Sequence, residues 1–199
     1  MKLHDRFRNI GSSSKDDLAS DGSINSIDYS SERNEFGYAS SDNMAYIRKF
    51  STDGSDMKLL AVLQGHDAEV TQIKWHAKLK QWITGSEDRT IRIWPATGIP
   101  CLRVINHDGT VTALCIDNLN NCVITGSQDK IIRVFDFEKG DEVVQKHFGH
   151  CDEVRSIIHL PARNQYVSAS WDNTVRIWNG RYPFNLSLFE KRPKASCKE

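Results

Sequence analysis

Apolar and polar residues alternate along most of the chain, from about residue 24 to residue 190. The alternation is plain in residues 70–75 (VTQIKW) and in residues 90–94 (TIRIW). Because successive side chains of a strand point to opposite faces of a sheet, a period of two residues predicts β-strands and not helices. Gly, Asp, Asn and Ser separate the runs, as turn residues do. The pattern therefore predicts an all-β fold of short strands.

One nine-residue phrase recurs, as SEDRTIRIW at 86–94, SQDKIIRVF at 127–135 and SWDNTVRIW at 170–178. The turn aspartates of the three copies, Asp88, Asp129 and Asp172, are separated by 41 and 43 positions. A weaker copy precedes them, because a step of 46 positions back from Asp88 reaches Asp42. A period just over 40 residues with four short strands per copy is typical of propeller blades. We expect about four four-stranded antiparallel blades, at residues 24–64, 70–106, 110–148 and 154–190.

The segments outside the repeats have a different composition. Residues 11–23 (GSSSKDDLASDGS) contain almost no apolar side chains. Such a segment cannot bury enough apolar surface to order itself. The sequence therefore predicts a flexible N-terminal tail at residues 1–23 and a short C-terminal tail at residues 191–199.

Within the repeats, the pairs Gly65-His66 and Gly149-His150, together with Trp94 and Trp178-Asn179, resemble the WD40-repeat family over roughly residues 20–190. The resemblance implies a β-propeller, usually of seven blades, that serves as a non-catalytic scaffold for other proteins. It also implies a hydrogen-bonded network of His, Ser or Thr, Asp and Trp inside each blade. In the second blade this set is His66, Thr84 or Ser86, Asp88 and Trp94; in the fourth it is His150, Ser168 or Ser170, Asp172 and Trp178. The choice between the two hydroxyls stays open.

A Ser or Thr, a His and an Asp are also the residues of a nucleophilic catalytic triad, so an active site is the alternative interpretation. The group recurs at the period of the fold and ends on a tryptophan, whereas an active site normally occurs once. No nucleophile-elbow sequence accompanies it. We therefore interpret the repeated residues as structural and expect no enzymatic activity.

Two copies depart from the pattern. The third has His107 and Asp129 but Phe135 in the tryptophan position, and since Phe has no donor its network should be shorter. The first keeps Asp42 but has Ser20 in the histidine position and Arg48 in the tryptophan position. We expect the first blade to be the least stable.

Residues beside the tight turns and at the start of the innermost strands form the partner-binding rim in the family that the chain resembles. The residues in these positions are Ser41, Glu87, Gln128 and Trp171 before the turn aspartates, and Glu69, Thr71, Thr110, Thr112, Glu153 and Arg155 on the innermost strands. Trp171 differs most from its counterparts, and Trp and Arg are favoured interface anchors. One hypothesis is a protein-binding patch of Trp171, Arg155 and Glu153; the alternative is that Trp171 packs over its own blade.

Residues 167–181 (VSASWDNTVRIWNGR) are also similar to the box found in WD40 substrate receptors of cullin-RING ubiquitin ligases. Trp178, Asn179 and Arg181 match the end of that box, and the planar guanidinium of Arg181 would face the adaptor. Substrate delivery to a ubiquitin ligase is therefore the alternative function, and the ligase adaptor the alternative partner.

Composition narrows the possible partners, cofactors and cellular location of the protein. The chain has 26 basic residues (Lys and Arg) and 26 acidic residues (Asp and Glu), so its net charge is zero. A neutral chain favours neither nucleic acid nor an anionic membrane as a partner. The seven histidines show no ligand spacing, and no metal or other cofactor is predicted. The first residues are charged and lack the apolar core of a secretory signal, and the five cysteines form no CxxC pair, which favours reduced thiols and a cytoplasmic or otherwise intracellular protein.

Four blades cannot easily close a ring of the usual seven, so the sequence predicts an open or partial propeller. A blade buries its apolar faces only against neighbouring blades. Either the chain is a shortened form of a longer propeller, or its open ends pair with a second copy or with another protein.

Overall fold

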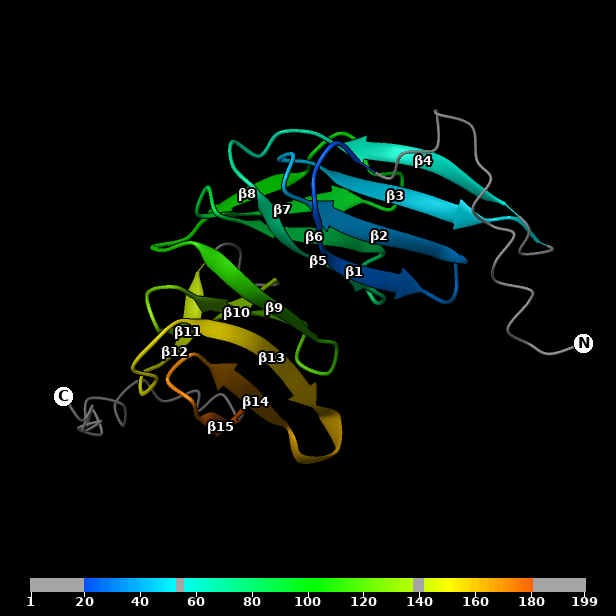
Figure 1. The fold of residues 1–199 in the computed structure, drawn as a ribbon. Helices are drawn as coiled ribbons and strands as arrows, with labels where there is room; N and C mark the ends of the chain where they lie inside the picture. Colours follow the sequence, from blue (N-terminus) through cyan, green and yellow to red (C-terminus); the bar gives the residue numbers. More distant parts are fainter. Residues whose placement is uncertain (1–19, 53–55, 138–141, 181–199) are drawn as a thin grey trace, which may run out of the picture.

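The computed structural model describes residues 20–52, 56–137 and 142–180. These residues form four antiparallel sheets, and each sheet is a meander in which strands adjacent in sequence are also adjacent in space (Figure 1). The first sheet contains β1 (Ile24–Ser30), β2 (Glu35–Ser40), β3 (Ala45–Phe50) and β4 (Met57–Leu63); the second β5 (Val70–His76), β6 (Gln81–Ser86), β7 (Thr90–Pro95) and β8 (Arg103–Asn106); the third β9 (Val111–Asp117), β10 (Cys122–Ser127), β11 (Ile132–Asp136) and β12 (Val143–His147); and the fourth β13 (Val154–Leu160), β14 (Gln165–Ser170) and β15 (Val175–Asn179). The predicted all-β class is confirmed.

The sheets stack side by side in chain order and form an open arc, not a closed ring (Figure 1). The innermost strands line the inside of the arc, where β1 contacts β5, β5 contacts β9 and β9 contacts β13. A 3₁₀ turn, η3 (Pro161–Arg163), joins β13 to β14. Over the part of the chain that the structure describes, no helix has the length and apolar character needed to cross a membrane.

Each interface between neighbouring sheets contains one apolar cluster. The first joins Ile47 and Leu63 to Val70, Ile73 and Trp82. The second cluster fills the interface between the second and third sheets, and the third cluster fills the interface between the third and fourth sheets. Strands buried between two other sheets must be apolar on both faces, which explains why the inner strands of the second and third sheets contain so few exposed residues.

The strands of the first three sheets fall inside the predicted segments 24–64, 70–106 and 110–148. The predicted fourth segment, 154–190, extends past the described residues, so the structure describes three of its strands. Residues 20–23 differ from the prediction of a flexible tail at 1–23. The Ser23 carbonyl accepts the Ser41 N–H at 2.9 Å and the Ser23 N–H donates to the Ser41 hydroxyl at 2.8 Å, which holds this part of the chain against the β2–β3 turn.

The cysteines only partly follow the expectation of reduced thiols. Cys101, Cys115 and Cys122 are not disulfide-bonded, and burial raises the pKa of Cys115 to about 11, so the Cys115 thiol stays protonated at neutral pH. Cys151 is disulfide-bonded, and for this residue the expectation is wrong.

Candidate functional site

The turn aspartates hold the hairpins between the second and third strands of each sheet. In all four sheets the residue after the aspartate has a positive φ, between 63° and 71°. Such a conformation is costly for residues other than Gly, with Asn the least penalised. The aspartate side chain offsets this cost by accepting the N–H two residues on, for example from Thr90 to Asp88 at 2.8 Å and from Ile131 to Asp129 at 3.0 Å.

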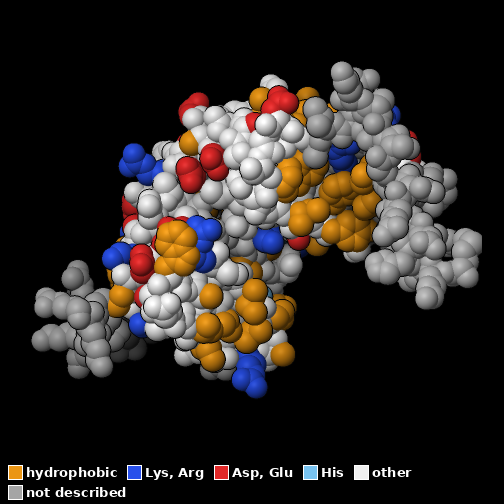
Figure 2. All heavy atoms as spheres, in the orientation of Figure 1, with side chains coloured by type: hydrophobic (Ala, Val, Ile, Leu, Met, Phe, Trp, Pro, Cys, Tyr) orange, Lys and Arg blue, Asp and Glu red, His pale blue; other side chains and the backbone are white. Residues whose placement is uncertain are grey.

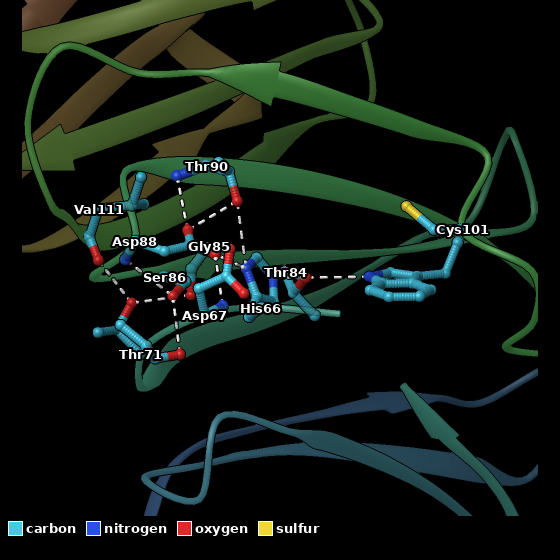
Figure 3. Close-up of polar contacts among 12 residues, drawn as sticks. His66, Asp67, Thr71, Thr84, Gly85, Ser86, Asp88, Thr90, Cys101 and Val111 are labelled. Carbon is cyan, nitrogen blue, oxygen red and sulfur yellow. Dashed lines mark hydrogen bonds and ion pairs between the residues drawn. The ribbon is translucent and has the colours of Figure 1, made fainter. Parts of the chain in front are cut away.

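In the second sheet the predicted network forms a continuous chain of hydrogen bonds (Figure 3). His66 Nδ1 lies 2.8 Å from an oxygen of Asp88, and His66 Nε2 lies 2.7 Å from the hydroxyl of Thr84. The indole N–H of Trp94 donates to the same hydroxyl at 3.0 Å. Burial lowers the pKa of His66, while Asp88 acts in the opposite direction. A neutral His66 that donates through Nδ1 satisfies every group in the series.

The fourth sheet repeats these contacts. His150 joins Asp172 and Ser168 at 2.7 Å each, and Trp178 donates to Ser168 at 2.7 Å. The open choice between hydroxyls is thereby resolved in favour of Thr84 and Ser168.

Ser86 and Ser170 have a different task. The hydroxyl of Ser86 donates to the Ala68 carbonyl and accepts the Asp88 N–H, both at 3.1 Å. Ser170 makes the equivalent contacts to Asp152 and Asp172. These two serines therefore hold each turn against the preceding loop.

The arrangement Asp88–His66–Thr84 has the connectivity of a nucleophilic triad, but the hydroxyl cannot meet a substrate. Thr84 and Ser168 are buried, and each hydroxyl is shared between an imidazole and an indole. A nucleophile must reach a reacting atom at close range. The geometry thus supports the structural interpretation.

The third sheet is organised differently. His107 Nε2 lies 3.0 Å from Thr125, but its Nδ1 lies 2.7 Å from the Gly109 carbonyl and not on Asp129. The prediction that His107 and Asp129 share one network is therefore wrong. Asp129 pairs instead with Arg133 at 2.6 Å, and Arg133 also reaches Asp108 at 2.8 Å.

The first sheet replaces the missing histidine and tryptophan with other polar groups. The hydroxyl of Tyr46 donates to Asp42 at 2.7 Å, and Arg48 Nε donates to the hydroxyl of Tyr38 at 3.1 Å. Tyr38 stands in the position of Thr84 and Arg48 in that of Trp94. A hydroxyl and a donor therefore still meet in the centre of this sheet. Ser20 stays outside the network and bonds to the Gly22 carbonyl.

A polar depression of about 460 Å³ lies where the starts of the innermost strands meet the tight turns. It contains nine of the residues that the sequence placed on the rim: Glu69, Thr71, Glu87, Thr110, Thr112, Gln128, Glu153, Arg155 and Trp171. Residues from the second, third and fourth sheets thus converge on one surface. Ser41 is the exception, because it bonds to Ser23 and does not line the depression.

Sequence reasoning missed Asn25 and Gln72, which complete the lining. Asn25 stands 46 positions before Thr71, so the repeat spacing could have identified it. Its side chain donates to the Val70 carbonyl of the next sheet at 3.0 Å, as Thr71 does to Val111 at 2.5 Å. These contacts between sheets had no signal in the sequence beyond the register itself.

Trp171 is 59% exposed, so its own sheet covers less than half of it. The guanidinium of Arg155 lies 4.7 Å from the centre of its ring, within cation–π range. Arg155 also pairs at 2.5 Å with Glu153, which is buried. The three residues therefore form one preorganised group, with the indole ring outermost.

Acidic side chains also line the depression. Glu69 and Glu87 are exposed, whereas the charge of Glu153 is compensated by Arg155. The depression therefore presents two exposed carboxylates and one exposed aromatic ring. Among the residues that the structure describes, no group of three metal-ligating side chains is present.

Arg181, the key residue of the predicted ligase-adaptor box, lies outside the described residues. Trp178, the other conspicuous member of that box, is accounted for by its bond to Ser168. The substrate-receptor hypothesis therefore stays a prediction.

Comparison with known proteins agrees with the repeat. The family model for the WD domain, G-beta repeat (WD40) matches residues 57–95, 99–136 and 141–179. The chain is 24% identical over 140 residues to the serine-threonine kinase receptor-associated protein of Dictyostelium discoideum, which covers 70% of the chain and 48% of that protein. It is 25% identical over 155 residues to a guanine nucleotide-binding protein subunit beta of Zea mays, covering 74% of the chain and 40% of the relative.

A ribosome biogenesis protein WDR12 homolog of Culex quinquefasciatus is 30% identical over 141 residues, covering 69% of the chain and 32% of that protein. The chain thus spans less than half the length of these relatives. Three repeats of the family model together cover more than half of the chain, and each runs from the outermost strand of one sheet through the first three strands of the next. The chain belongs to the WD40-repeat family.

Proposed function

We propose that this chain is a non-catalytic scaffold that binds a segment of another protein in the polar depression, with Trp171 as the anchor. The observation that carries the proposal is the convergence of four sheets on one surface that includes an exposed tryptophan contacted by Arg155. Trp is among the residues most enriched at the energetic centres of protein–protein interfaces.

The charges of the depression indicate what the partner presents. Glu69 and Glu87 accept hydrogen bonds from a Lys, an Arg or a backbone N–H, while an apolar or aromatic side chain packs on Trp171. The relatives support an assembly role in general terms, since their names describe a receptor-associated protein and a subunit of a larger protein. The buried hydroxyls of Thr84 and Ser168 support a function without catalysis.

The test is quantitative capture of partners from cell extract by the full chain, compared with Trp171→Ala. We expect the bound proteins to fall at least severalfold, because truncation of an interface tryptophan costs about 2–4 kcal/mol. Leu119→Ala is the matched control, since Leu119 is equally exposed but lies outside the depression in the β9–β10 turn. Partners retained at wild-type level by Trp171→Ala would contradict the proposal.

A further inference from the structure

Among residues 20–52, 56–137 and 142–180, the first and fourth sheets each have one apolar face that no neighbouring sheet covers. We call the face of a sheet that packs against the following sheet its trailing face, and the face that packs against the preceding sheet its leading face. Three interior interfaces join a trailing to a leading face. One trailing face, on the fourth sheet, and one leading face, on the first, remain.

The trailing faces of the second and third sheets share a pair of β-branched residues on the third strand. Ile91 and Ile93 in the second sheet and Ile132 and Val134 in the third are buried. The same positions in the fourth sheet hold Val175 and Ile177, which are 68% and 63% exposed. The side chains are of the same kind, and no sheet among the described residues covers them.

The leading faces show the complementary pattern on the innermost strand. Ile73, Leu114 and Ile157 occupy equivalent positions and are buried against the preceding sheet. Their counterpart in the first sheet, Ile27, is 61% exposed, and Ile24 and Tyr29 beside it are exposed as well. Figure 2 shows hydrophobic side chains gathered over the first and the fourth sheets.

The close fit at each interior interface depends on a small residue under a β-branched one. A Cβ added to Gly126 would lie 2.6 Å from Val154, and Gly85 meets Val111 in the same way. At the first interface Ala39 takes the glycine position in the cluster with Val70. The fourth sheet has Ala169 in this position and the first sheet has Ile24 in the position of Val70, so the same pair is available between two copies.

A polar contact accompanies each interface and gives it a direction. Asn25, Thr71 and Thr112 each donate to a backbone carbonyl of the following sheet, at Val70, Val111 and Val154. The fourth sheet places Arg155 in this position, a donor with a longer reach. A following sheet would therefore meet both the apolar and the polar halves of the interface.

We propose that the occupant of these faces is a second copy of this chain, packed head to tail, so that the first sheet of each copy covers the fourth sheet of the other. The interface would be a fourth instance of one that the chain already forms three times. Both unpartnered faces are then covered by one two-fold operation. Two copies of four sheets give eight, which lies within the range of about four to eight blades that closed propellers have.

The mass of the full chain in solution tests the proposal, measured by light scattering coupled to size exclusion over a wide range of concentration. We expect about twice the chain mass of 22.7 kDa, with no larger species, because the ring is closed. Ile27→Lys and Ile177→Lys should each give a monomer, because a buried lysine would oppose packing. Leu119→Lys is the matched control and should stay dimeric, since Leu119 is 62% exposed in the β9–β10 turn.

Mixing the two variants separates this arrangement from other dimers. Ile27→Lys retains an intact trailing face and Ile177→Lys an intact leading face, so the mixture should form a dimer that neither variant forms alone. Far-UV circular dichroism checks that both are folded, as exposed substitutions rarely unfold a protein. A monomeric wild type, an Ile27→Lys variant that stays dimeric alone, or a polymer that grows with concentration would each overturn the proposal.

Discussion

The second and third sheets occupy equivalent positions in the arc, each packed between two neighbours, yet they hold their turns by different polar contacts. In the second, His66 links Asp88 to Thr84, and Trp94 closes the series. In the third, His107 turns to the Gly109 carbonyl and Asp129 pairs with Arg133. Strand order and turn geometry are nevertheless the same.

The difference shows what the repeated residues are needed for. A buried polar group must find a partner, but which partner it finds is free to vary as long as none is left unsatisfied. Phe135 needs no acceptor, so Thr125 keeps only His107 and the Arg133 carbonyl as partners. If the network carried chemistry, this exchange would remove it. The network is instead one of several ways to satisfy the buried polar groups of a sheet.

The largest expected effect tests whether packing, and not the network, dominates both sheets. Trp94→Ala and Phe135→Ala should each lower the free energy of unfolding by about 3–5 kcal/mol, because both rings are buried in clusters between sheets. Urea denaturation followed by circular dichroism measures both. A loss of under about 1 kcal/mol for either variant would contradict the assigned packing.

Part of the structure of these two sheets could be predicted from the sequence, and the same residues show which part. The period of 41 placed Asp88 and Asp129 in turns, and alternation placed Ile91 and Ile132 in strands, because both signals are local. The contacts of Asp129 were missed because Asp129 pairs with Arg133, four residues on in β11, and Arg133 also binds a second carboxylate, Asp108. A repeat pattern shows which positions are equivalent, not which alternative partners compete for them.

The features of the candidate site likewise divide into those that the sequence predicted and those that it did not. Rim positions such as Glu87 and Gln128 were found from the register alone, since every sheet presents its turn on the same side. The sequence left open whether Trp171 is exposed or packed over its own blade, because the orientation of Trp171 depends on Arg155 and on the pairing of Arg155 with the buried Glu153. These contacts occur in the fourth sheet and have no counterpart at Glu87.

A smaller effect distinguishes the two histidines by pH. Burial, assisted by the charge of Arg133, lowers the pKa of His107 from 6.5 to about 4. The unfolded chain thus binds more protons between these values, so stability is complete above pH 6.5 and falls as the pH drops toward 4, by up to about 1.4 kcal/mol per pH unit for this residue. Burial also lowers the pKa of His66, but Asp88 opposes the shift.

His107→Gln should therefore flatten the dependence of stability on pH between 6.5 and 4 more than His66→Gln does. Urea midpoints measured at intervals across this range give both slopes, and the remaining slope is expected from His147, whose pKa burial also lowers to about 4. Identical slopes for His107→Gln and the wild type would show that His107 is not protected from protonation as its contacts indicate.

The smallest effect converts the second sheet into a copy of the third. Trp94→Phe keeps an aromatic ring in the interface but removes the N–H that donates to Thr84, and should lower the free energy of unfolding by about 1 kcal/mol beyond the loss of ring volume. Trp82→Phe is the matched control, because Trp82 is equally buried and its indole N–H has no hydrogen-bond partner. In Thr84→Val the acceptor is already absent, so Trp94→Phe should cost no more there than Trp82→Phe. Equal losses for Trp94→Phe in the two backgrounds would mean that the indole bond contributes nothing, and that the tryptophan is retained in the second sheet for its volume alone.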